Sequence, residues 1–266
     1  MPELTRHNGV VAQLHVHRFG PADAPTILAL HGLTGHGLRW AALAERLPEY
    51  RIIAPDLRGH GASTSLPPWD FETISADLLE LVEAESTGPV LLLGHSFGGA
   101  CALHLLRRRP DLAHRLILLD PAVALDPQML TMIALASLAA PDYADRDAAR
   151  RDKLATGWDD ADPRLLEAEL AQHLVPTDNG RVAWRTNLAA TTAYWGQLAR
   201  PFVVPPAELK TVLVQAMRSQ PPMVTPEFRA ALVTHQGANL TVLEWDCQHM
   251  VVQSHADEVA ALVRGQ

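Results

Sequence analysis

Residues 89–100 read Pro-Val-Leu-Leu-Leu-Gly-His-Ser-Phe-Gly-Gly-Ala. The apolar run at 90–93 predicts a short strand buried on both faces, and the apolar spacing at 100–106 predicts a helix. Between them, Gly94-His95-Ser96-Phe97-Gly98 fits the pattern Gly-x-Ser-x-Gly. Such a turn exposes the serine hydroxyl, and the following helix directs free N–H groups toward an anion formed beside it. We interpret Ser96 as a nucleophile; the alternative is a connecting turn in which Ser96 caps the helix.

The composition bounds the class of protein. Of the 266 residues, 48% are apolar and 20% charged, which is ordinary for a soluble enzyme with one large α/β domain or with a core and an insertion. Twenty-two basic and thirty acidic residues give a net charge of −8, which argues against a nucleic-acid-binding surface. The basic run Arg107-Arg108-Arg109 falls where the helix after Ser96 should end, and cations there complement the helix dipole.

The cysteine content and the N-terminal sequence indicate the cellular compartment in which we expect the protein. Cys101 and Cys247 are too few for a disulfide framework and lack metal-ligand spacing, so we expect buried thiols in a reducing environment. The N-terminus shows no charged-then-apolar signal pattern, and no apolar run reaches membrane-spanning length. We therefore expect a cytoplasmic protein without membrane association.

The first hundred residues alternate predicted strands with turns and helices. Residues 10–18 have the alternation of an edge strand, with His15 and His17 on one side; we interpret these as exposed histidines, because no third ligand for a metal is in view. A strand at 26–30 leads into His31-Gly32-Leu33-Thr34-Gly35, and a helix follows at 40–47. The free N–H groups of this glycine-rich turn can receive an oxyanion, or the turn is an ordinary connection.

The same rhythm continues to residue 121. A strand at 52–54 is followed by Asp56 and Arg58, which we interpret as a turn held by side-chain hydrogen bonds rather than as catalysts. A helix is predicted at 73–84 and, after the Ser96 turn, a strand at 115–119 that ends in Asp120-Pro121. Regular alternation of strand and helix predicts a mostly parallel sheet with right-handed crossovers.

The alternation breaks between residues 122 and 206. Helical spacing is found at 127–138, 145–155, 164–173 and 182–195, and no strand is predicted. Such a stretch is too long for a simple connection. We interpret it as a helical cap over the sheet edge, and the alternative is a helical satellite with a small core of its own. Trp158, Trp184, Tyr194 and Trp195 concentrate aromatic surface in this stretch, and we expect Trp184, Tyr194 and Trp195 to contact substrate.

The last sixty residues return to alternation, with strands at 211–214 and 240–245 and helices at 226–233 and 256–263. His249 lies in the loop after the last strand, at the sheet edge where Ser96 is expected, and imidazole can act as base for a serine. His255 begins the final helix. The other histidines after Ser96 are expected to be structural or to lie on helix surfaces and ends; they are His104, His114, His173 and His235.

Through these motifs together, the chain resembles the α/β-hydrolase fold family. The matching residues are His31-Gly32, Asp56-x-Arg58-Gly59-x-Gly61, Gly94-His95-Ser96-Phe97-Gly98-Gly99 and His249-Met250-Val251, and they cover nearly the full length. The resemblance implies an α/β-hydrolase core at 1–121 and 207–266 with a helical cap at 122–206. It also implies Ser96 as nucleophile, His249 as base, and the backbone N–H groups of Leu33 and Phe97 as oxyanion hole.

One departure concerns the acid. The family's usual carboxylate follows the strand at 211–214, where this chain reads Ala216-Met217-Arg218-Ser219-Gln220-Pro221. Certain haloalkane dehalogenases of this fold carry the acid one strand earlier, which is the position of Asp120. We therefore assign Asp120 as the acid, although Asp-Pro is also a good turn former. Asp246 and Glu227 are the distant alternatives.

The nucleophile narrows the chemistry. Haloalkane dehalogenases and epoxide hydrolases of this fold use a carboxylate where Ser96 stands, so we expect acyl transfer from a small to medium apolar ester, lactone or thioester, without cofactor or metal. Hydrolysis of a carbon–carbon bond in a diketone-type acid uses the same triad and stays open, and perhydrolysis has no specific support. The alternative from another functional class is a ligand-binding homologue that has lost catalysis. The absence of a carboxylate after residue 214 is the observation that supports this alternative.

Overall fold

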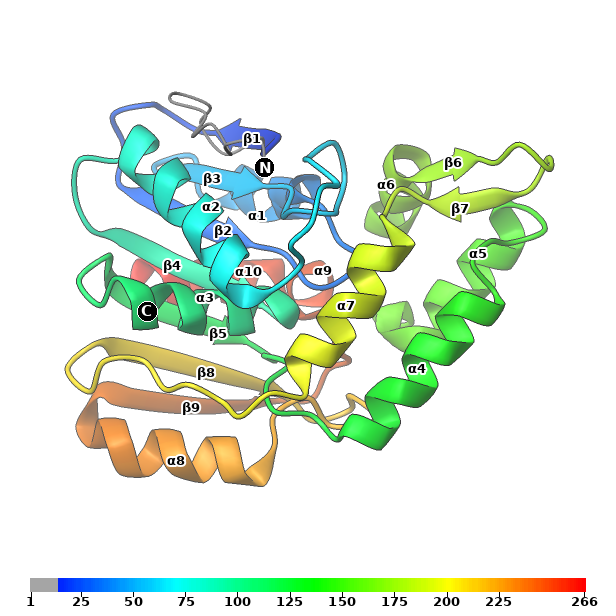
Figure 1. The fold of residues 1–266 in the computed structure, drawn as a ribbon. Helices are drawn as coiled ribbons and strands as arrows, with labels where there is room; N and C mark the ends of the chain where they lie inside the picture. Colours follow the sequence, from blue (N-terminus) through cyan, green and yellow to red (C-terminus); the bar gives the residue numbers. More distant parts are fainter. Residues whose placement is uncertain (1–13) are drawn as a thin grey trace, which may run out of the picture.

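Seven strands form the central sheet, in the order β1-β3-β2-β4-β5-β8-β9, in the computed structural model, which describes residues 14–266 (Figure 1). β1 pairs antiparallel with β3, and the other neighbouring strands are parallel. The mostly parallel sheet expected from the sequence is therefore confirmed. Its strands are β1 (Val16–Phe19), β2 (Thr26–Leu30), β3 (Arg51–Pro55), β4 (Val90–His95), β5 (Ala113–Leu119), β8 (Lys210–Ala216) and β9 (Leu240–Trp245).

Helices cover both faces of this sheet. Successive side chains of a strand point to opposite faces, so Leu28 and Leu30 of β2 pack in one core cluster and Ile27 and Ala29 in another. Because both faces are covered, the central strands are apolar throughout rather than alternating. One cluster includes α2 (Phe71–Glu85), α3 (Phe97–Arg108) and α8 (Pro226–Gln236); the other includes α1 (Ala41–Arg46), α9 (Val251–Ser254) and α10 (Ala256–Arg264).

Two local expectations, on the end of α3 and on the cysteines, are met in the described part of the chain. α3 ends at Arg108, and Arg107 and Arg108 are exposed at its end. Cys101 and Cys247 are buried free thiols. Of the edge strand expected at 10–18, residues 10–13 lie outside the described range, and the strand itself runs over Val16–Phe19. Within residues 14–266, no helix has the length and apolar character needed to cross a membrane.

Residues 122–206 lie at one end of the sheet, beyond the ends of the parallel strands (Figure 1). The prediction of a purely helical segment is wrong in one place, because a short antiparallel hairpin stands where helix was expected at 182–184. Its turn is made by Asp178-Asn179-Gly180, with Gly180 at a φ of 77° that favours glycine. The segment comprises α4 (Pro127–Ala139), α5 (Arg146–Lys153), η2 (Leu154–Trp158), α6 (Pro163–His173), β6 (Leu174–Pro176), β7 (Val182–Trp184) and α7 (Leu188–Leu198).

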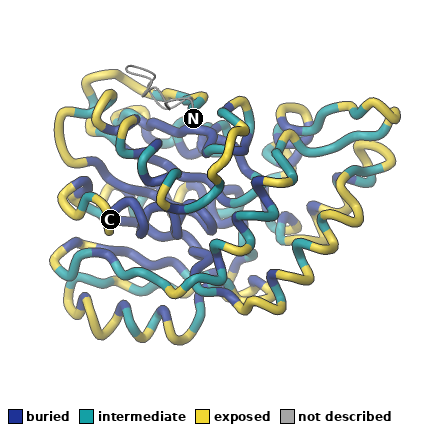
Figure 2. Tube along the Cα trace, in the orientation of Figure 1, coloured by how far each residue is buried: buried dark blue, intermediate teal, exposed yellow. Residues whose placement is uncertain are grey.

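This segment is buried to different degrees along its length. Figure 2 shows α4 largely exposed, whereas α7 runs against the buried centre of the molecule. Tyr194 and Leu198 of α7 are buried in the same cluster as α2 and α3. Trp158 and Leu166 belong to a small separate cluster that also contains Met250, the residue after His249. The segment therefore has a small core of its own and is also packed onto the sheet domain.

Candidate active site

Ser96 stands at the junction of β4 and α3 with a φ of 53° and a ψ of −121°. A non-glycine residue at positive φ is uncommon and marks a turn held under strain by its surroundings. Ser96 precedes the first helical residue, yet its side chain makes no capping hydrogen bond. The hydroxyl is thus not used as a helix cap, which was the alternative interpretation of this residue.

Two glycines allow the turn to exist. A Cβ on Gly98 would lie 2.1 Å from the carbonyl oxygen of Leu30 on the neighbouring strand. A Cβ on Gly94 would lie 2.7 Å from the carbonyl oxygen of Gly98. Both distances are far below van der Waals contact, so the tight passage from β4 to α3 requires glycine at both positions.

His249 and Asp120 meet although they are far apart in sequence. Nδ1 of His249 lies 2.6 Å from Oδ2 of Asp120. A carboxylate only accepts, so Nδ1 carries the hydrogen and Nε2 is left as an acceptor. Asp120 directly follows β5 and is fully buried. Its N–H donates to the carbonyl of Val214 at 2.7 Å and its Oδ1 accepts from the N–H of Ala216 at 3.2 Å, so β8 fixes the carboxylate.

The two alternative acids lie elsewhere. The side chain of Asp246 is 93% exposed and lies 3.5 Å from Arg218. Glu227 is exposed in the first turn of α8. Neither has a hydrogen bond to His249 among the described residues, whereas Asp120 does.

His95 also contacts His249. Its Nε2 donates to the carbonyl oxygen of His249 at 2.8 Å, and the two ring centroids are 4.8 Å apart. Burial, followed by the proximity of His249, holds the pKa of His95 well below its usual range, so this imidazole is neutral. Sequence reasoning missed this contact, because it considered His95 only as the variable position of the Gly-x-Ser-x-Gly pattern.

The turn after β2 lies directly against Ser96. A Cβ on Gly32 would lie 3.1 Å from Cβ of Ser96. Nδ1 of His31 donates to the carbonyl of Gly32 at 2.8 Å, and its Nε2 accepts from the N–H of Leu57 at 2.9 Å. The backbone of the turn is thereby fixed beside the serine. Phe97 begins α3, so its N–H has no partner within the helix.

A cavity of about 540 Å³ opens at this point, between the sheet domain and residues 122–206. Ser96, His249 and Leu33 line it from the sheet domain. The tyrosine and tryptophan residues that line it are Tyr143, Trp158, Trp184 and Trp195.

Tyr194 differs from the expectation of a substrate-facing residue. It is fully buried, its hydroxyl donates to the carbonyl of Arg58 at 3.1 Å, and its ring centroid lies 4.8 Å from that of Phe97. Neighbouring positions on a helix point about 100° apart, so α7 turns Trp195 toward the cavity and Tyr194 toward the core. Tyr194 is therefore a packing residue.

Comparison with known proteins places this arrangement in a family. The sequence profile described as the alpha/beta hydrolase family matches residues 27–262. The chain belongs to the alpha/beta hydrolase family. This α/β hydrolase is 46% identical to the protein named Lipase LipV from Mycobacterium tuberculosis over 257 residues, covering 97% of this chain and 98% of that protein.

Solved structures of α/β hydrolases share the fold. The thioesterase domain from the curacin biosynthetic pathway superposes with a TM-score of 0.74 at 23% identity, covering 94% of each chain. A marine microorganism esterase superposes with a TM-score of 0.76 at 20% identity, covering 96% of this chain and 99% of that one. At these identities the likeness concerns the fold alone.

This hydrolase also has a buried ionic cluster that sequence reasoning missed. The carboxylate of Glu169 accepts a hydrogen bond from Nε2 of His36 at 2.9 Å and two from the guanidinium of Arg39, at 2.5 and 3.0 Å. It also lies 3.4 Å from Nζ of Lys153. His36 and Arg39 belong to the sheet domain, whereas Glu169 and Lys153 belong to residues 122–206. The cluster therefore joins the two parts, and Arg39 and Lys153 also line the cavity.

Neighbouring charges and burial shift the pKa values of Glu169 and Lys153 in opposite directions. Burial alone would raise the pKa of Glu169, but Arg39, Lys153 and His36 hold it well below its usual value. Burial lowers the pKa of Lys153 to about 8 against the opposing effect of Glu169. Nζ of Lys153 and Cζ of Arg39 also lie 5.1 and 5.3 Å from the ring centroid of Trp158, within cation–π range.

The remaining histidines after Ser96 lie outside the candidate site. His104 is buried in α3 and stacks on Phe71 with ring centroids 4.2 Å apart, which is the structural role expected of it. His173 ends α6 but is buried rather than on the helix surface, because its ring stacks on that of His36 from the sheet domain, with centroids 4.4 Å apart. His114 is exposed, and His235 lies near the end of α8.

Proposed function

We propose that this α/β hydrolase is a serine esterase that cleaves a carboxylic ester, lactone or thioester of a small to medium apolar substrate through an acyl-enzyme. Ser96 is the nucleophile, His249 the general base and Asp120 the acid that orients it. The observation that carries the proposal is the 2.6 Å contact between His249 and Asp120, together with the place of His249 and Ser96 on the wall of the same cavity.

The proposed reaction has two halves. Oγ of Ser96 attacks the carbonyl carbon while Nε2 of His249 takes its proton, and the oxyanion so formed is held by backbone N–H groups. The bond to the leaving oxygen or sulfur breaks as His249 returns the proton to that atom. Water then attacks the acyl-enzyme, again giving its proton to His249, and collapse releases the acid and restores the Ser96 hydroxyl. Asp120 stabilises the imidazolium formed in each half.

The oxyanion hole is assigned to the N–H groups of Leu33 and Phe97. The support for Phe97 is its place as first residue of α3, where the helix dipole also favours negative charge. The support for Leu33 is the closeness of the preceding Gly32 to Ser96, together with the place of Leu33 on the cavity wall. Two preorganised donors of this kind are worth several kcal/mol in the transition state, about 3–4 for one donor.

Residues 122–206 are proposed to act as a cap that selects the substrate. The cavity wall carries the rings of Trp184 and Trp195, which suit an apolar acyl or alcohol group. The relative called Lipase LipV matches over nearly the whole of both chains, which favours an ester among the candidate substrates. The thioesterase domain from the curacin pathway shares only the fold, so a thioester is the weaker candidate.

A catalytically silent homologue was the alternative because no carboxylate follows β8. Asp120 supplies a carboxylate from the neighbouring strand, so the observation that favoured this alternative loses its force. Carbon–carbon bond hydrolysis would use the same three residues, and it is distinguished by the substrates turned over rather than by the site.

The experiment combines covalent labelling with turnover. An active-site-directed organophosphonate should add one adduct mass to the intact protein, located on the peptide containing Ser96, and Ser96→Ala should abolish both labelling and hydrolysis of chromogenic esters. A panel of esters of increasing acyl length, with a thioester and a diketone-type acid, assigns the class. Labelling at another serine, or ester turnover that survives Ser96→Ala, would overturn the proposal.

A further inference from the structure

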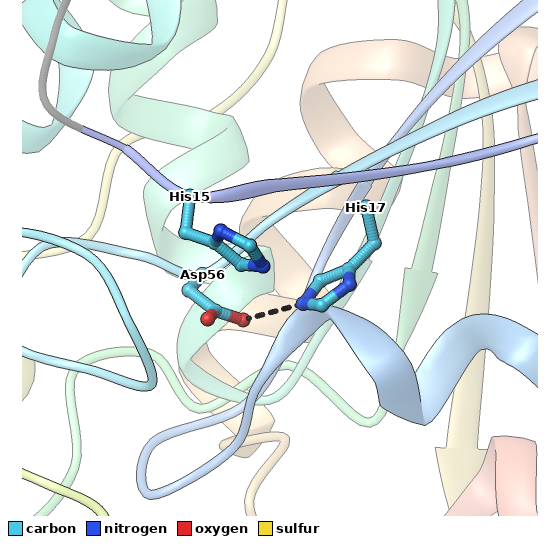
Figure 3. Close-up of side chains that lie close together, drawn as sticks. All are labelled: His15, His17 and Asp56. Atoms are coloured by element: carbon cyan, nitrogen blue, oxygen red, sulfur yellow. Dashed lines mark ion pairs between the residues drawn. The ribbon is translucent and has the colours of Figure 1, made fainter.

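Three potential metal ligands gather at the edge of the sheet, away from the cavity. His15 directly precedes β1 and is exposed, His17 lies within β1, and Asp56 follows β3 and is buried (Figure 3). Residues two apart on a strand point to the same side, so both imidazoles face Asp56. The antiparallel register holds the strands together here, because the N–H of Asp56 donates to the carbonyl of His15 at 2.8 Å.

The distances between the potential ligand atoms of these three residues are close to those needed to bind one metal ion. One ligand atom from each of the three residues can be chosen so that all lie within 4.8 Å of one another. Nε2 of His17 is 3.4 Å from Oδ1 of Asp56, and the rings of His15 and His17 are 4.6 Å apart at an interplanar angle of 81°. The sequence interpretation of His15 and His17 as isolated exposed histidines missed the third group.

We propose that His15, His17 and Asp56 bind a divalent transition-metal ion, with Zn²⁺ as the preferred ion. Imidazole nitrogen and carboxylate oxygen are ligands that Zn²⁺ takes at about 2.0–2.2 Å, which places tetrahedral ligands about 3.3 Å apart. His17 and Asp56 already have this separation. The remaining separations are at most 4.8 Å, so His15 needs to move by up to about 1.5 Å, which rotation of an exposed side chain provides. Three protein ligands leave the fourth position to water.

The carboxylate of Asp56 is held by the backbone in a manner that leaves it free to coordinate. Oδ1 accepts from the N–H of Gly37 at 2.7 Å, and Oδ2 accepts from the N–H of Ala62 at 2.9 Å. Each carboxylate oxygen has two acceptor sites, so one remains on each after these bonds. Supporting hydrogen bonds of this type orient a metal ligand and raise its affinity for the ion. The turn role expected of Asp56 and the metal role are thus compatible.

The backbone of His15 is fixed by the same loop. Its N–H donates to Oγ of Ser63 at 2.8 Å, and that hydroxyl donates to the carbonyl of Asp56 at 2.5 Å. An ion bound here would link the edge strand β1 to the loop after β3. None of the three ligands lines the cavity that contains Ser96, so the ion would stabilise this edge and take no part in the proposed ester chemistry.

The test measures Zn²⁺ binding to untagged, metal-free protein by titration calorimetry. We expect one Zn²⁺ per chain and a melting temperature that rises with Zn²⁺ concentration. His15→Ala should weaken binding at least about tenfold, since loss even of a supporting group at a metal site has that effect. His17→Gln should weaken it similarly. His114→Ala, which removes an exposed histidine from β5, is the matched control and should bind as wild type does.

A second readout uses Cu²⁺ as probe, whose electron paramagnetic resonance spectrum should show two coordinated imidazole nitrogens, reduced to one in His15→Ala. His15 is exposed, so its replacement leaves folding intact, and the metal-free melting temperature verifies this. Absence of saturable Zn²⁺ binding, or binding of unchanged affinity in both His15→Ala and His17→Gln, would overturn the proposal. Ester hydrolysis is not part of this readout, so the two proposals fail independently.

Discussion

Nε2 of His95 lies 2.8 Å from the carbonyl oxygen of His249, so the residue just before Ser96 supports the loop that carries the proposed base. The same loop is held on its other side by the contact of His249 with Asp120. The base is therefore fixed through both its backbone and its ring. Its position relative to Ser96 depends on β4, which carries His95, as well as on β5, which Asp120 directly follows.

Replacing His95 by Phe tests this support. The variant keeps an aromatic ring but loses the donor, so the loop should shift and kcat should fall about tenfold or more, while KM changes little, because misplacement of a catalytic group by about 1 Å is costly. Steady-state kinetics on one ester measure both constants. His104→Phe, a buried histidine on α3 outside the site, is the matched control. Equal kcat in the two variants would show that the hydrogen bond does not position His249.

Asp120→Asn tests the proposed role of Asp120 as the acid that orients His249. Oδ1 can still accept from Ala216, but the amide that replaces Oδ2 cannot accept from His249 and favours the wrong tautomer. The corresponding change in a serine protease lowers kcat by about 10⁴, and we expect a loss of several orders of magnitude here with the melting temperature nearly unchanged.

Asp246→Asn is the control for this experiment, because its exposed side chain should leave turnover unaltered. If Asp120→Asn lowered the melting temperature while turnover per folded molecule survived, Asp120 would be a turn former only. Both quantities are to be measured on the same preparation.

Substitutions on α7 and β7 separate selectivity from packing. Trp184→Ala and Trp195→Ala enlarge the cavity, so the ratio of rates on long and short acyl esters should change more than the rate on an acetate ester. An ester panel measures this ratio, and a uniform rate loss in both tryptophan variants would contradict the selective role.

Tyr194→Ala tests packing, because it removes a fully buried ring and should cost about 3–5 kcal/mol of unfolding free energy. Urea unfolding measures this cost.

Glu169→Gln tests the buried ionic cluster. The variant leaves Arg39 and Lys153 buried without their carboxylate, which should cost about 3–5 kcal/mol at neutral pH. Because the pKa of Glu169 is well below the unperturbed value of 4.5, the folded protein binds fewer protons than the unfolded chain below that pH. Stability contributed by Glu169 is therefore present above pH 4.5 and lost as the pH falls.

The unfolding free energies of wild type and Glu169→Gln should accordingly begin to converge as the pH falls below about 4.5, as measured by urea titration at a series of pH values. Glu72→Gln is the matched control, because its pair with Arg200 is exposed and should be worth no more than about 1 kcal/mol. A pH-independent difference between wild type and Glu169→Gln would contradict the charge-based explanation.

Much of this fold was predictable because its signals are local. Apolar runs such as 90–93 and 26–30 identify strands buried on both faces, and the glycines around Ser96 identify the turn. Asp120 could be proposed as the acid because the position after β8 lacks a carboxylate and certain haloalkane dehalogenases of this fold carry the acid after the strand that precedes it. The hairpin of β6 and β7 was also within reach, since Asn179-Gly180 between two apolar runs is a hairpin signal.

Other features depend on contacts between distant residues and could not be inferred. The pairing of Glu169 with His36 joins positions 133 residues apart, and nothing in either neighbourhood indicates the other. The orientation of Tyr194 and Trp195 depends on how α7 is rotated against the core, and both residues are equally aromatic in sequence. Asp56 was recognised only as a turn residue, because its closeness to His15 and His17 follows from the antiparallel pairing of β1 with β3.

α7 belongs to the cavity wall and to the main core at once. Trp195 lines the cavity, while Tyr194 packs on Phe97, the residue that begins the helix after Ser96. A chimera that imports the proposed cap of a relative should therefore exchange residues 127–184, retain α7, and keep Lys153 and Glu169, because Glu169 pairs with His36 and Arg39 of the sheet domain. Transplanting the whole of 122–206 would remove the packing partner of Phe97 and disturb the turn on which Ser96 stands. The modular unit for specificity engineering is thus smaller than the insertion itself.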